Sequence, residues 1–240
     1  MIARLQNAID KAKRIVFFSG AGMSTASGIP DFRSSTGLYK QNYRAEEILS
    51  HSFFMENPKE FYEFYREKMI YEDAKPNYAH QFISELQNQK EVIVVTQNID
   101  GLHQKAGSKI VHELHGSIHR NYCMKCHKFH PLASITNSNG IPHCSCGGTI
   151  KPDVVLYEEG LDGNTIDNAI NAISTCDLLV ICGTSLSVYP AASFVRYFRG
   201  DNLAIINKSS TPYDEYCNIV INDDLVETFS KLEIIDSSRR

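Results

Sequence analysis

Four of the seven cysteines lie within one short segment, in a spacing that suits a metal ion. Cys123 and Cys126 are separated by two residues, and Cys144 and Cys146, after seventeen intervening residues, are separated by one. Tetrahedral Zn²⁺ takes two such pairs of thiolates from a short ribbon, and four thiolates leave no coordination position for water or substrate. The sequence therefore predicts one structural zinc ion. Nearby histidines are alternative ligands: His127, His130 and His143.

A second candidate site is the stretch "GAGMSTASGIPDFRS", which follows an apolar run near the start of the chain. Gly20 and Gly22 stand where a phosphate-cradling turn needs them, and the hydroxyls of Ser24 and Thr25 could meet a pyrophosphate. A dehydrogenase fingerprint has a third glycine at the position of Thr25, followed by an uninterrupted helix, whereas here Pro30 breaks the pattern. The turn predicts NAD binding without hydride transfer.

A third group of polar residues, in "VTQNIDGLH", follows another apolar run. Gln97, Asn98 and Asp100 fall at the carboxyl end of that run, where open α/β sheets bind ligands. An amide together with a carboxylate complements a carboxamide such as nicotinamide. An Asx turn at Asp100 and Gly101 is the alternative explanation for two of these residues.

Two histidines, His112 and His115, lie in "VHELHGS" just before the cysteine segment. Because Gly116 lets another group approach closely, His115 can face an open cleft, and the ordinary pKa of histidine suits a general base. For either histidine taken alone, a structural role is the alternative.

Short apolar, β-branched runs predict the strands that position these residues. Runs that are apolar on both faces are typical of a parallel sheet covered by helices. The expected strands are 14–20, 91–97, 177–183, 202–208 and 218–222, and the expected helices are 76–87, 165–174 and 190–197. The alternation predicts an α/β fold, a Rossmann-like doubly wound parallel sheet.

Two stretches depart from this alternation and predict a smaller domain beside the sheet. One is aromatic and helical, with Asn57, Pro58 and Glu60 in the spacing of a capping box at a helix start. The other, 121–151, is loop-like and carries the four cysteines. We expect a discontinuous Rossmann-like domain at 1–38, 76–118 and 152–240, with a helical insertion at 39–75 and a zinc ribbon at 119–151.

Length and charge limit the function classes. At 240 residues the chain suits one large domain with an inserted module, and its net charge of −4 gives no sign of a nucleic-acid or membrane surface. The first residues contain no apolar stretch long enough for a signal peptide or a membrane span, so we expect a cytoplasmic protein. The oligomeric state is open, with a monomer preferred.

Taken together, these segments resemble the sirtuin family, the NAD-dependent protein deacylases, over nearly the whole chain. The motifs that carry the resemblance are "GAGMSTASGIPDFRS", "TQNIDGLH", "LHGS", the paired cysteines, "KPDVVLYEEGL" and "CGTSLSVYPA". The resemblance implies that the acyl-lysine carbonyl oxygen attacks C1′ of the nicotinamide ribose, with His115 as general base. The products are nicotinamide, deacylated lysine and O-acetyl-ADP-ribose.

The resemblance also implies which residues contact NAD. Asn98 and Asp100 are expected to act beside His115 in catalysis by holding the nicotinamide, and Phe32 to cover the reacting ribose. The expected NAD contacts are Gly20, Ala21, Gly22, Thr25, Asp31, Phe32, Arg33, Gln97, Asn98, Ile99, Asp100, Gly183, Thr184, Ser185, Asn207, Lys208, Asp224 and Leu225. Leu225 stands where the family usually has alanine at the adenine.

Acyl-lysine proteins or peptides are the partners that the resemblance implies, bound as an added strand between 154–160 and 184–190. The expected substrate contacts are Val154, Val155, Leu156, Tyr157, Glu158, Tyr65 and Lys68. Glu158 replaces the usual glycine, so it either favours basic peptides or points into solvent, and the second is preferred.

Acyl specificity depends on the helical insertion. Desuccinylating relatives carry Tyr-x-x-Arg, whereas Lys68 is a point charge at the arginine position, so acetyl or other uncharged acyl groups are preferred. The alternatives are a desuccinylase or other deacylase, a protein mono-ADP-ribosyltransferase, and an NAD-sensing binding module without turnover.

Overall fold

The computed structural model describes residues 1–32, 37–38 and 44–235. Its larger part is a six-stranded sheet in the order β3-β2-β1-β7-β8-β9, in which all neighbouring strands are parallel. The strands are β1 (Arg14–Ser19), β2 (Glu91–Thr96), β3 (Val111–Glu113), β7 (Leu178–Cys182), β8 (Asn202–Ile206) and β9 (Ile219–Ile221). The predicted Rossmann-like sheet is confirmed, and β3 is an additional edge strand that the sequence analysis did not predict.

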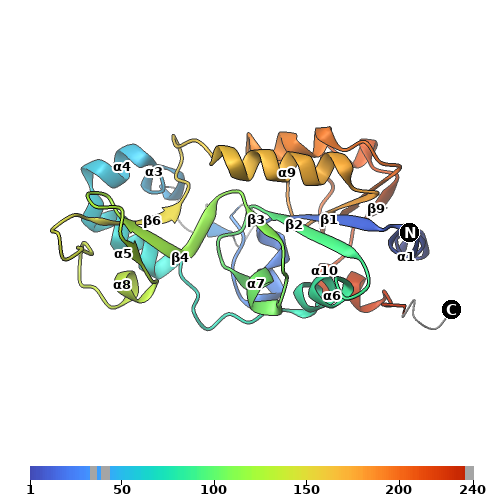
Figure 1. The fold of residues 1–240 in the computed structure, drawn as a ribbon, viewed down its shortest axis with the longest axis horizontal. Helices are drawn as coiled ribbons and strands as arrows, with labels where there is room; N and C mark the ends of the chain where they lie inside the picture. The colour runs from blue at the N-terminus through green and yellow to red at the C-terminus, as the bar shows by residue number, and fades with distance from the viewer. Residues whose placement is uncertain (33–36, 39–43, 236–240) are drawn as a thin grey trace.

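Helices cover both faces of this sheet (Figure 1). One face carries α1 (Ile2–Lys11), α6 (Tyr78–Leu86), α7 (Leu102–Ala106) and α10 (Leu225–Ser230), and the other carries α9 (Gly163–Thr175) and the 3₁₀ helix η3 (Ala191–Tyr197). The predicted helix at 190–197 is thus of the 3₁₀ type. Of the helices in the described ranges, none combines the length and apolar character needed to cross a membrane.

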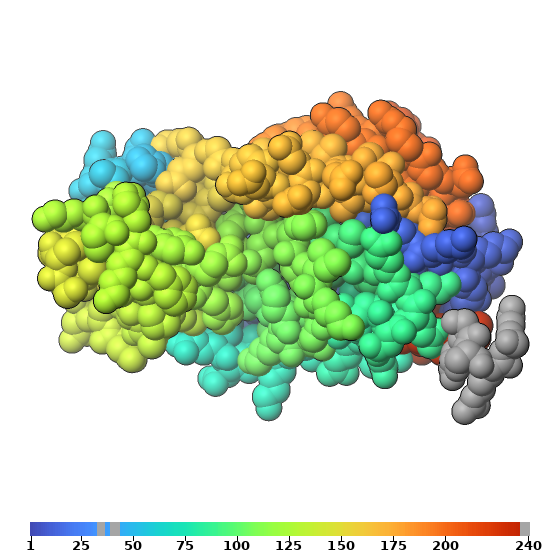
Figure 2. All heavy atoms as spheres, in the orientation of Figure 1, coloured from blue at the N-terminus to red at the C-terminus, as the bar shows by residue number. Residues whose placement is uncertain are grey.

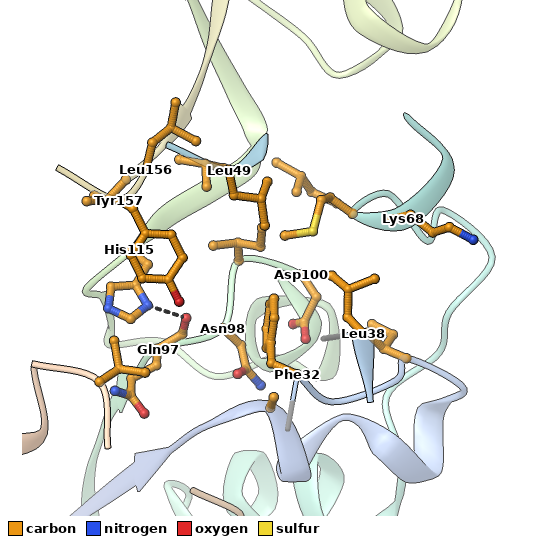
Figure 3. A pocket seen from close by; sticks show the side chains of 18 of the residues that line it. Phe32, Leu38, Leu49, Lys68, Gln97, Asn98, Asp100, His115, Leu156 and Tyr157 are labelled. Carbon is orange, nitrogen blue, oxygen red and sulfur yellow. Dashed lines mark hydrogen bonds between the residues drawn. The ribbon is translucent and has the colours of Figure 1, made fainter. Parts of the chain in front are cut away.

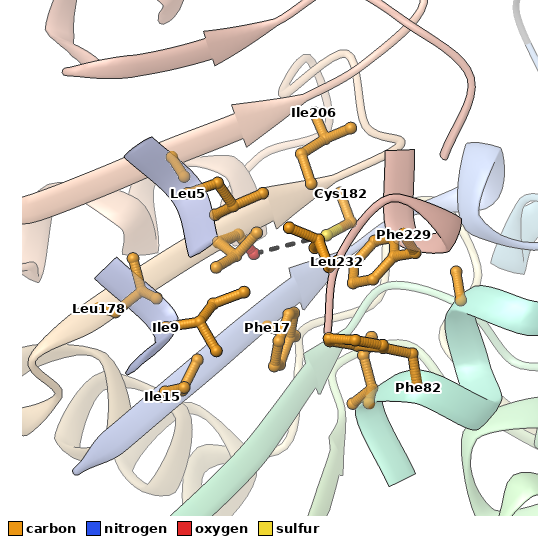
Figure 4. Close-up of a cluster of buried hydrophobic side chains, with 14 of the residues drawn as sticks. Leu5, Ile9, Ile15, Phe17, Phe82, Leu178, Cys182, Ile206, Phe229 and Leu232 are labelled. Carbon is orange, nitrogen blue, oxygen red and sulfur yellow. Dashed lines mark hydrogen bonds between the residues drawn. The ribbon is translucent and has the colours of Figure 1, made fainter. Parts of the chain in front are cut away.

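Alternating side chains of the strands fill two separate cores. Phe17 of β1 packs with Phe82 and Phe229 in the core beneath α6 and α10 (Figure 4). Its neighbours Val16 and Phe18 point to the opposite core, against α9 and η3. Because successive strand side chains point to opposite faces, a central strand must be apolar throughout to fill both cores.

The strand order reverses between β1 and β7, and this reversal determines where a ligand can bind. From β1 the chain continues to β2 on one side, whereas β7 lies on the other side. Connections that leave neighbouring strands in opposite directions open a crevice at the carboxyl ends. The first connection begins with two 3₁₀ turns, η1 (Ala21–Met23) and η2 (Thr25–Ser27), rather than a continuous helix.

A smaller module lies at one end of the sheet (Figure 1). It contains a three-stranded antiparallel sheet in the order β5-β4-β6 and an aromatic core built around Phe54, Phe61, Tyr62 and Tyr65. Its elements are α3 (Ala45–Ile48), α4 (His51–Glu56), α5 (Pro58–Lys68), β4 (Gly116–Cys123), β5 (Phe129–His130), α8 (Ala133–Thr136) and β6 (Ile150–Val154). The loop-like description of 121–151 was therefore incomplete, because turns and cysteines separate short strands there.

The predicted capping box at the start of α5 was wrong. Asn57 is the N-cap residue and Pro58 takes the first helical position, but the Asn57 side chain makes no capping hydrogen bond. Asn57 also ends α4, where its backbone N–H donates to the carbonyl oxygen of Phe53, and its φ of −130° and ψ of 53° are not those of a standard N-cap. A capping box forms instead at the start of α6, between Asn77 and His80.

Candidate active site

The loops that follow β1 and β7 cross in direct contact at the switch point. The backbone N–H of Gly20 donates to the carbonyl oxygen of Cys182 at 3.0 Å, and that of Gly22 donates to Gly183 at 2.8 Å. A Cβ atom on Gly22 would lie 2.8 Å from the Gly183 Cα atom, and Gly183 itself has a φ of +59°. Glycine is required at both positions, and the two loops form one wall of a cavity.

This cavity, of 560 Å³, collects most of the expected NAD contacts. Those that line it are Ala21, Gly22, Thr25, Asp31, Phe32, Gln97, Asn98, Gly183, Thr184, Ser185, Asn207, Lys208, Asp224 and Leu225. Gly20 is not among them, and a Cβ atom at this position would meet the Thr184 side chain at 2.6 Å. Ile99 and Asp100 line a second cavity instead. Arg33 lies outside the described residues. Lining residues that the sequence analysis missed are Met23, Ala26, Val188, Ser209 and Val226.

Ser24 joins the two polar residues that were expected to hold nicotinamide. Its hydroxyl donates to Asp100 Oδ2 at 2.6 Å and accepts from Asn98 Nδ2 at 3.1 Å, so it is not directed at a pyrophosphate. Burial raises the pKa of Asp100, while hydrogen bonds from Ser24 and from the Leu102 backbone N–H oppose that rise. The bond to Leu102 is the Asx turn that the sequence analysis gave as the alternative explanation. Asp100 therefore stabilises this turn with Oδ1 and binds Ser24 in the site with Oδ2.

His115 lines both this cavity and the second one. Its Nδ1 lies 3.0 Å from the carbonyl oxygen of Gln97. Since a carbonyl oxygen can only accept, Nδ1 carries the hydrogen and Nε2 keeps its lone pair. Burial lowers the pKa of His115, so the imidazole is neutral at neutral pH. His112, in β3, lines neither cavity and pairs with Val95 in the sheet.

The second cavity, of 240 Å³, is largely apolar. Phe32, Leu38, Leu49 and Leu156 converge in it with His115 at one side (Figure 3). Further apolar lining residues are Ile29, Pro30, Met69, Ile99, Ile118, Val154, Val155, Leu161, Val188 and Pro190. The neutral imidazole of His115 therefore lies between a cavity lined by many polar side chains, called the polar cavity below, and an apolar one.

The expected substrate contacts divide into two groups. Val154, Val155, Leu156, Tyr157, Glu158 and Lys68 line the apolar cavity. Tyr65 does not, because it is buried in the aromatic core of the small module, stacked on Phe61 with ring centroids 5.6 Å apart. The Lys68 ammonium pairs with Glu67 at 2.8 Å and points away from the other labelled side chains (Figure 3).

The four cysteines lie together in the small module. Their sulfur atoms all lie within 4.8 Å of one another, with Cys123 and Cys146 3.4 Å apart and Cys126 and Cys144 3.7 Å apart. Zinc–sulfur bonds of about 2.3 Å in a tetrahedron place sulfurs about 3.8 Å apart, so the donor set fits one zinc ion. None of the four lines either cavity, so a zinc ion held there has a structural role.

Comparisons with known proteins agree with this geometry. The sequence profile of the Sir2 family matches residues 20–190. The chain belongs to the Sir2 family. An NAD-dependent protein deacetylase of Clostridium acetobutylicum is 54% identical over 231 residues, which cover 93% of this chain and 94% of the relative.

Solved Sir2 structures share the fold of this Sir2-family chain. A complex described as Sir2–p53 peptide–NAD⁺ superposes with a TM-score of 0.86 at 36% identity, over 96% of both chains. A structure of Sir2Tm bound to a propionylated peptide gives a TM-score of 0.84 at 36% identity, again over 96% of both chains.

Behind Asn98, this Sir2-family protein contains a buried polar network that the sequence analysis missed. Thr96 Oγ1 accepts from the Asn98 backbone N–H at 3.0 Å and from Ser19 Oγ at 2.8 Å. Ser19 Oγ lies 3.0 Å from His103 Nε2, and the His103 ring packs against that of His80. Burial lowers the pKa of both histidines. No local sequence signal links these residues, since they come from four separate segments.

Proposed function

We propose that this Sir2-family chain is an NAD-dependent protein lysine deacetylase. The observation that carries the proposal is the position of His115, whose imidazole lines both cavities and whose Nε2 has no hydrogen-bond partner among the described residues. A sensor without turnover needs no such base. The relatives named as NAD-dependent protein deacetylases support the same conclusion, because they are about half identical over nearly the full chain.

The residues of the polar cavity fit NAD. The glycines let the loops after β1 and β7 pack against each other, and Ala21, Gly22 and Gly183 then line the cavity where a pyrophosphate can bind. The Nε2 donor of Gln97 is buried without a partner among the described residues, so it can bind a ribose oxygen. When bound, NAD supplies an electrophilic ribose carbon whose leaving group is nicotinamide.

The chain's own residues orient the reactants. Asn98 and Asp100, connected through Ser24, are fixed donors and acceptors for the carboxamide of nicotinamide. We place the acyl-lysine side chain in the apolar cavity, where Phe32 and Leu156 exclude water from the reacting carbons. His115 Nε2 accepts the proton of a ribose hydroxyl, and the resulting imidazolium stays oriented by the carbonyl oxygen of Gln97.

The reaction balances as a transfer of the acyl group from the lysine nitrogen to ADP-ribose. One NAD and one water are consumed, and nicotinamide, free lysine and O-acetyl-ADP-ribose are released. Because Lys68 is paired with Glu67 and turned away from the other labelled lining residues, we propose uncharged acyl groups as the preferred substrates.

The test is to incubate the protein with NAD and with acetyl-, succinyl- or longer acyl-lysine peptides, and to follow nicotinamide release and peptide mass. We expect loss of the acyl mass and an equal amount of nicotinamide with the acetyl peptide. ADP-ribose attached to protein, with no deacylated peptide, would instead identify a mono-ADP-ribosyltransferase. Faster removal of succinyl than of acetyl would identify a desuccinylase.

We also propose that residues 39–75 and 119–151 form the small domain and that the rest of the chain forms the Rossmann-like domain. We further propose that the protein acts as a monomer in the cytoplasm. The separate aromatic core of the small module supports the division. Four free thiols arranged for zinc support a reducing compartment. Light scattering and cell fractionation test the monomer and the location.

A further inference from the structure

The segment that follows β6 is hydrogen-bonded to His115 on one side and to the helical insertion on the other. The backbone N–H of Val155 donates to the carbonyl oxygen of His115, and that of Tyr157 donates to Leu49, both at 3.0 Å. The backbone N–H of His51 donates to the carbonyl oxygen of Tyr157, also at 3.0 Å. Figure 2 shows the blue atoms of the helical insertion against the yellow atoms of this segment. The next residue, Glu158, is therefore fixed at the edge of the apolar cavity.

The Glu158 side chain is exposed but held in place. Its backbone φ is +75°, the left-handed region that residues other than glycine seldom adopt. Its Oε2 accepts hydrogen bonds from the backbone N–H of Ser52 at 2.9 Å and from Ser52 Oγ at 2.6 Å. These bonds lower the pKa of Glu158, so the carboxylate is ionised at neutral pH. The side chain thus does more than point into solvent.

The two neighbouring glutamates differ in charge compensation. Glu159 pairs with Lys151 at 3.1 Å and with His51 at 2.8 Å, so it is compensated locally. For Glu158, by contrast, no ion pair forms within the part of the chain that the structure describes. The Glu158 side of the apolar cavity consequently carries a fixed negative charge that no cationic side chain among the described residues pairs with.

We propose that Glu158 selects substrate proteins that carry a cationic residue beside the acyl-lysine. The inference rests on the proposed function, because it requires the peptide to pass along residues 154–160. Exposed charge pairs are weak and are screened by salt, so the preference amounts to about threefold to fivefold at low ionic strength.

The test uses two acetyl-lysine peptides that differ only in having arginine or glutamate on both sides of the acetyl-lysine. We expect the wild-type kcat/KM to be about threefold to fivefold higher for the arginine peptide, and the ratio to shrink in 0.5 M NaCl. Glu158→Gln keeps an acceptor for Ser52 and removes the charge, so the ratio should approach one. Glu56→Gln, at the other end of α4 and outside both cavities, is the matched control and should keep the wild-type ratio.

Glu158→Gly provides a second variant that removes both the charge and the left-handed strain, so a folding defect is not expected. Fluorescence anisotropy of labelled peptides without NAD measures the same preference as a ratio of affinities. If the wild type turns over neither peptide, the proposed function fails, and the anisotropy ratio still decides the role of Glu158. Equal ratios in wild type and Glu158→Gln, or a wild type that prefers the glutamate peptide, would overturn the inference.

Discussion

Thr96 and Asn98 are linked by a hydrogen bond from the Asn98 backbone N–H to the Thr96 hydroxyl, 3.0 Å long and buried. The hydroxyl also accepts from Ser19, so two donors depend on one oxygen atom at the end of β2. This bond fixes the loop from which the Asn98 side chain reaches Ser24. The position of Asn98 in the active site is therefore set from within the sheet.

Thr96→Val should disturb the nicotinamide end of the site. The substitution keeps the side-chain shape but leaves the buried Asn98 N–H unpaired, at a cost of about 1–3 kcal/mol, and removes the acceptor of the Ser19 hydroxyl, which keeps only its contact with His103. We expect a higher KM for NAD and weaker inhibition by nicotinamide. The affinity for ADP-ribose, which lacks nicotinamide, should stay the same in titration calorimetry. Thr96→Ser, which restores the oxygen, should recover the wild-type KM; if it does not, Thr96 acts through packing alone.

His115→Ala should lower the rate of deacetylation by about 10²–10⁴-fold, the range for loss of a general base. Circular dichroism and zinc content should match the wild type, and full retained activity would contradict the mechanism. His112→Ala is the control, because His112 lines neither cavity.

The pH profile of the wild type gives an independent check on His115. Because burial lowers the pKa of His115, the imidazole loses its proton at a lower pH than an exposed histidine does. We expect kcat/KM to rise with pH, with a midpoint below about 6.5, and to be flat through neutral pH. A midpoint above 7 for this limb would show that His115 is not the base.

Gly22→Ala should weaken NAD binding because the loops after β1 and β7 would have to separate. The added Cβ would meet the Gly183 Cα and carbonyl oxygen at 2.8 Å, and overpacking of this kind costs about 1–3 kcal/mol. Gly163→Ala is the matched control, since a Cβ there meets nothing within 4 Å. The rise in unfolding temperature that NAD causes would measure NAD binding in each variant. An equal rise in Gly22→Ala and Gly163→Ala would argue against this role for Gly22.

Removing zinc should unfold the ribbon rather than block the chemistry directly. Cys123→Ala should lose the metal together with part of the far-ultraviolet dichroism, because a zinc ion would tie Cys123, the last residue of β4, to the turns that carry the other three cysteines. Cys217→Ala, outside the cluster, should keep one zinc per chain in atomic absorption. A folded Cys123→Ala protein without activity would instead indicate a direct catalytic role.

Acid should destabilise the protein partly through His80. Its pKa is lowered to about 4 by burial, so between pH 6.5 and 4 the unfolded chain binds a proton that the folded chain does not. The free energy of unfolding therefore decreases as the pH falls from 6.5 to 4, and His80 contributes up to about 1.4 kcal/mol per pH unit to this decrease. His80→Gln should show a shallower decline in urea unfolding. Equal slopes for variant and wild type would mean that His80 does not contribute.

The central strands of the large sheet were predictable because each of them contacts two apolar cores, which leaves a run without polar interruptions. Four strands were not predictable. β3 and β5 have only three and two residues, β4 is partly exposed and begins and ends with Gly116 and Cys123, and β6 contains Pro152. The failed capping box at Asn57 has a similar cause: the spacing was right, but the end of the preceding helix determined the backbone angles.

By itself the sequence determined the parallel sheet, the glycine turn, the cysteine pairs and the histidine beside Gly116, because each depends on residue types that are close along the chain. Only the tertiary structure decided that Ser24 joins Asn98 to Asp100, that Tyr65 packs in a core while Lys68 lines the cavity, and that Glu158 is anchored by Ser52. These relationships depend on how distant segments approach one another, and side-chain burial and hydrogen-bond direction are fixed only when the two sheets and their helices pack together.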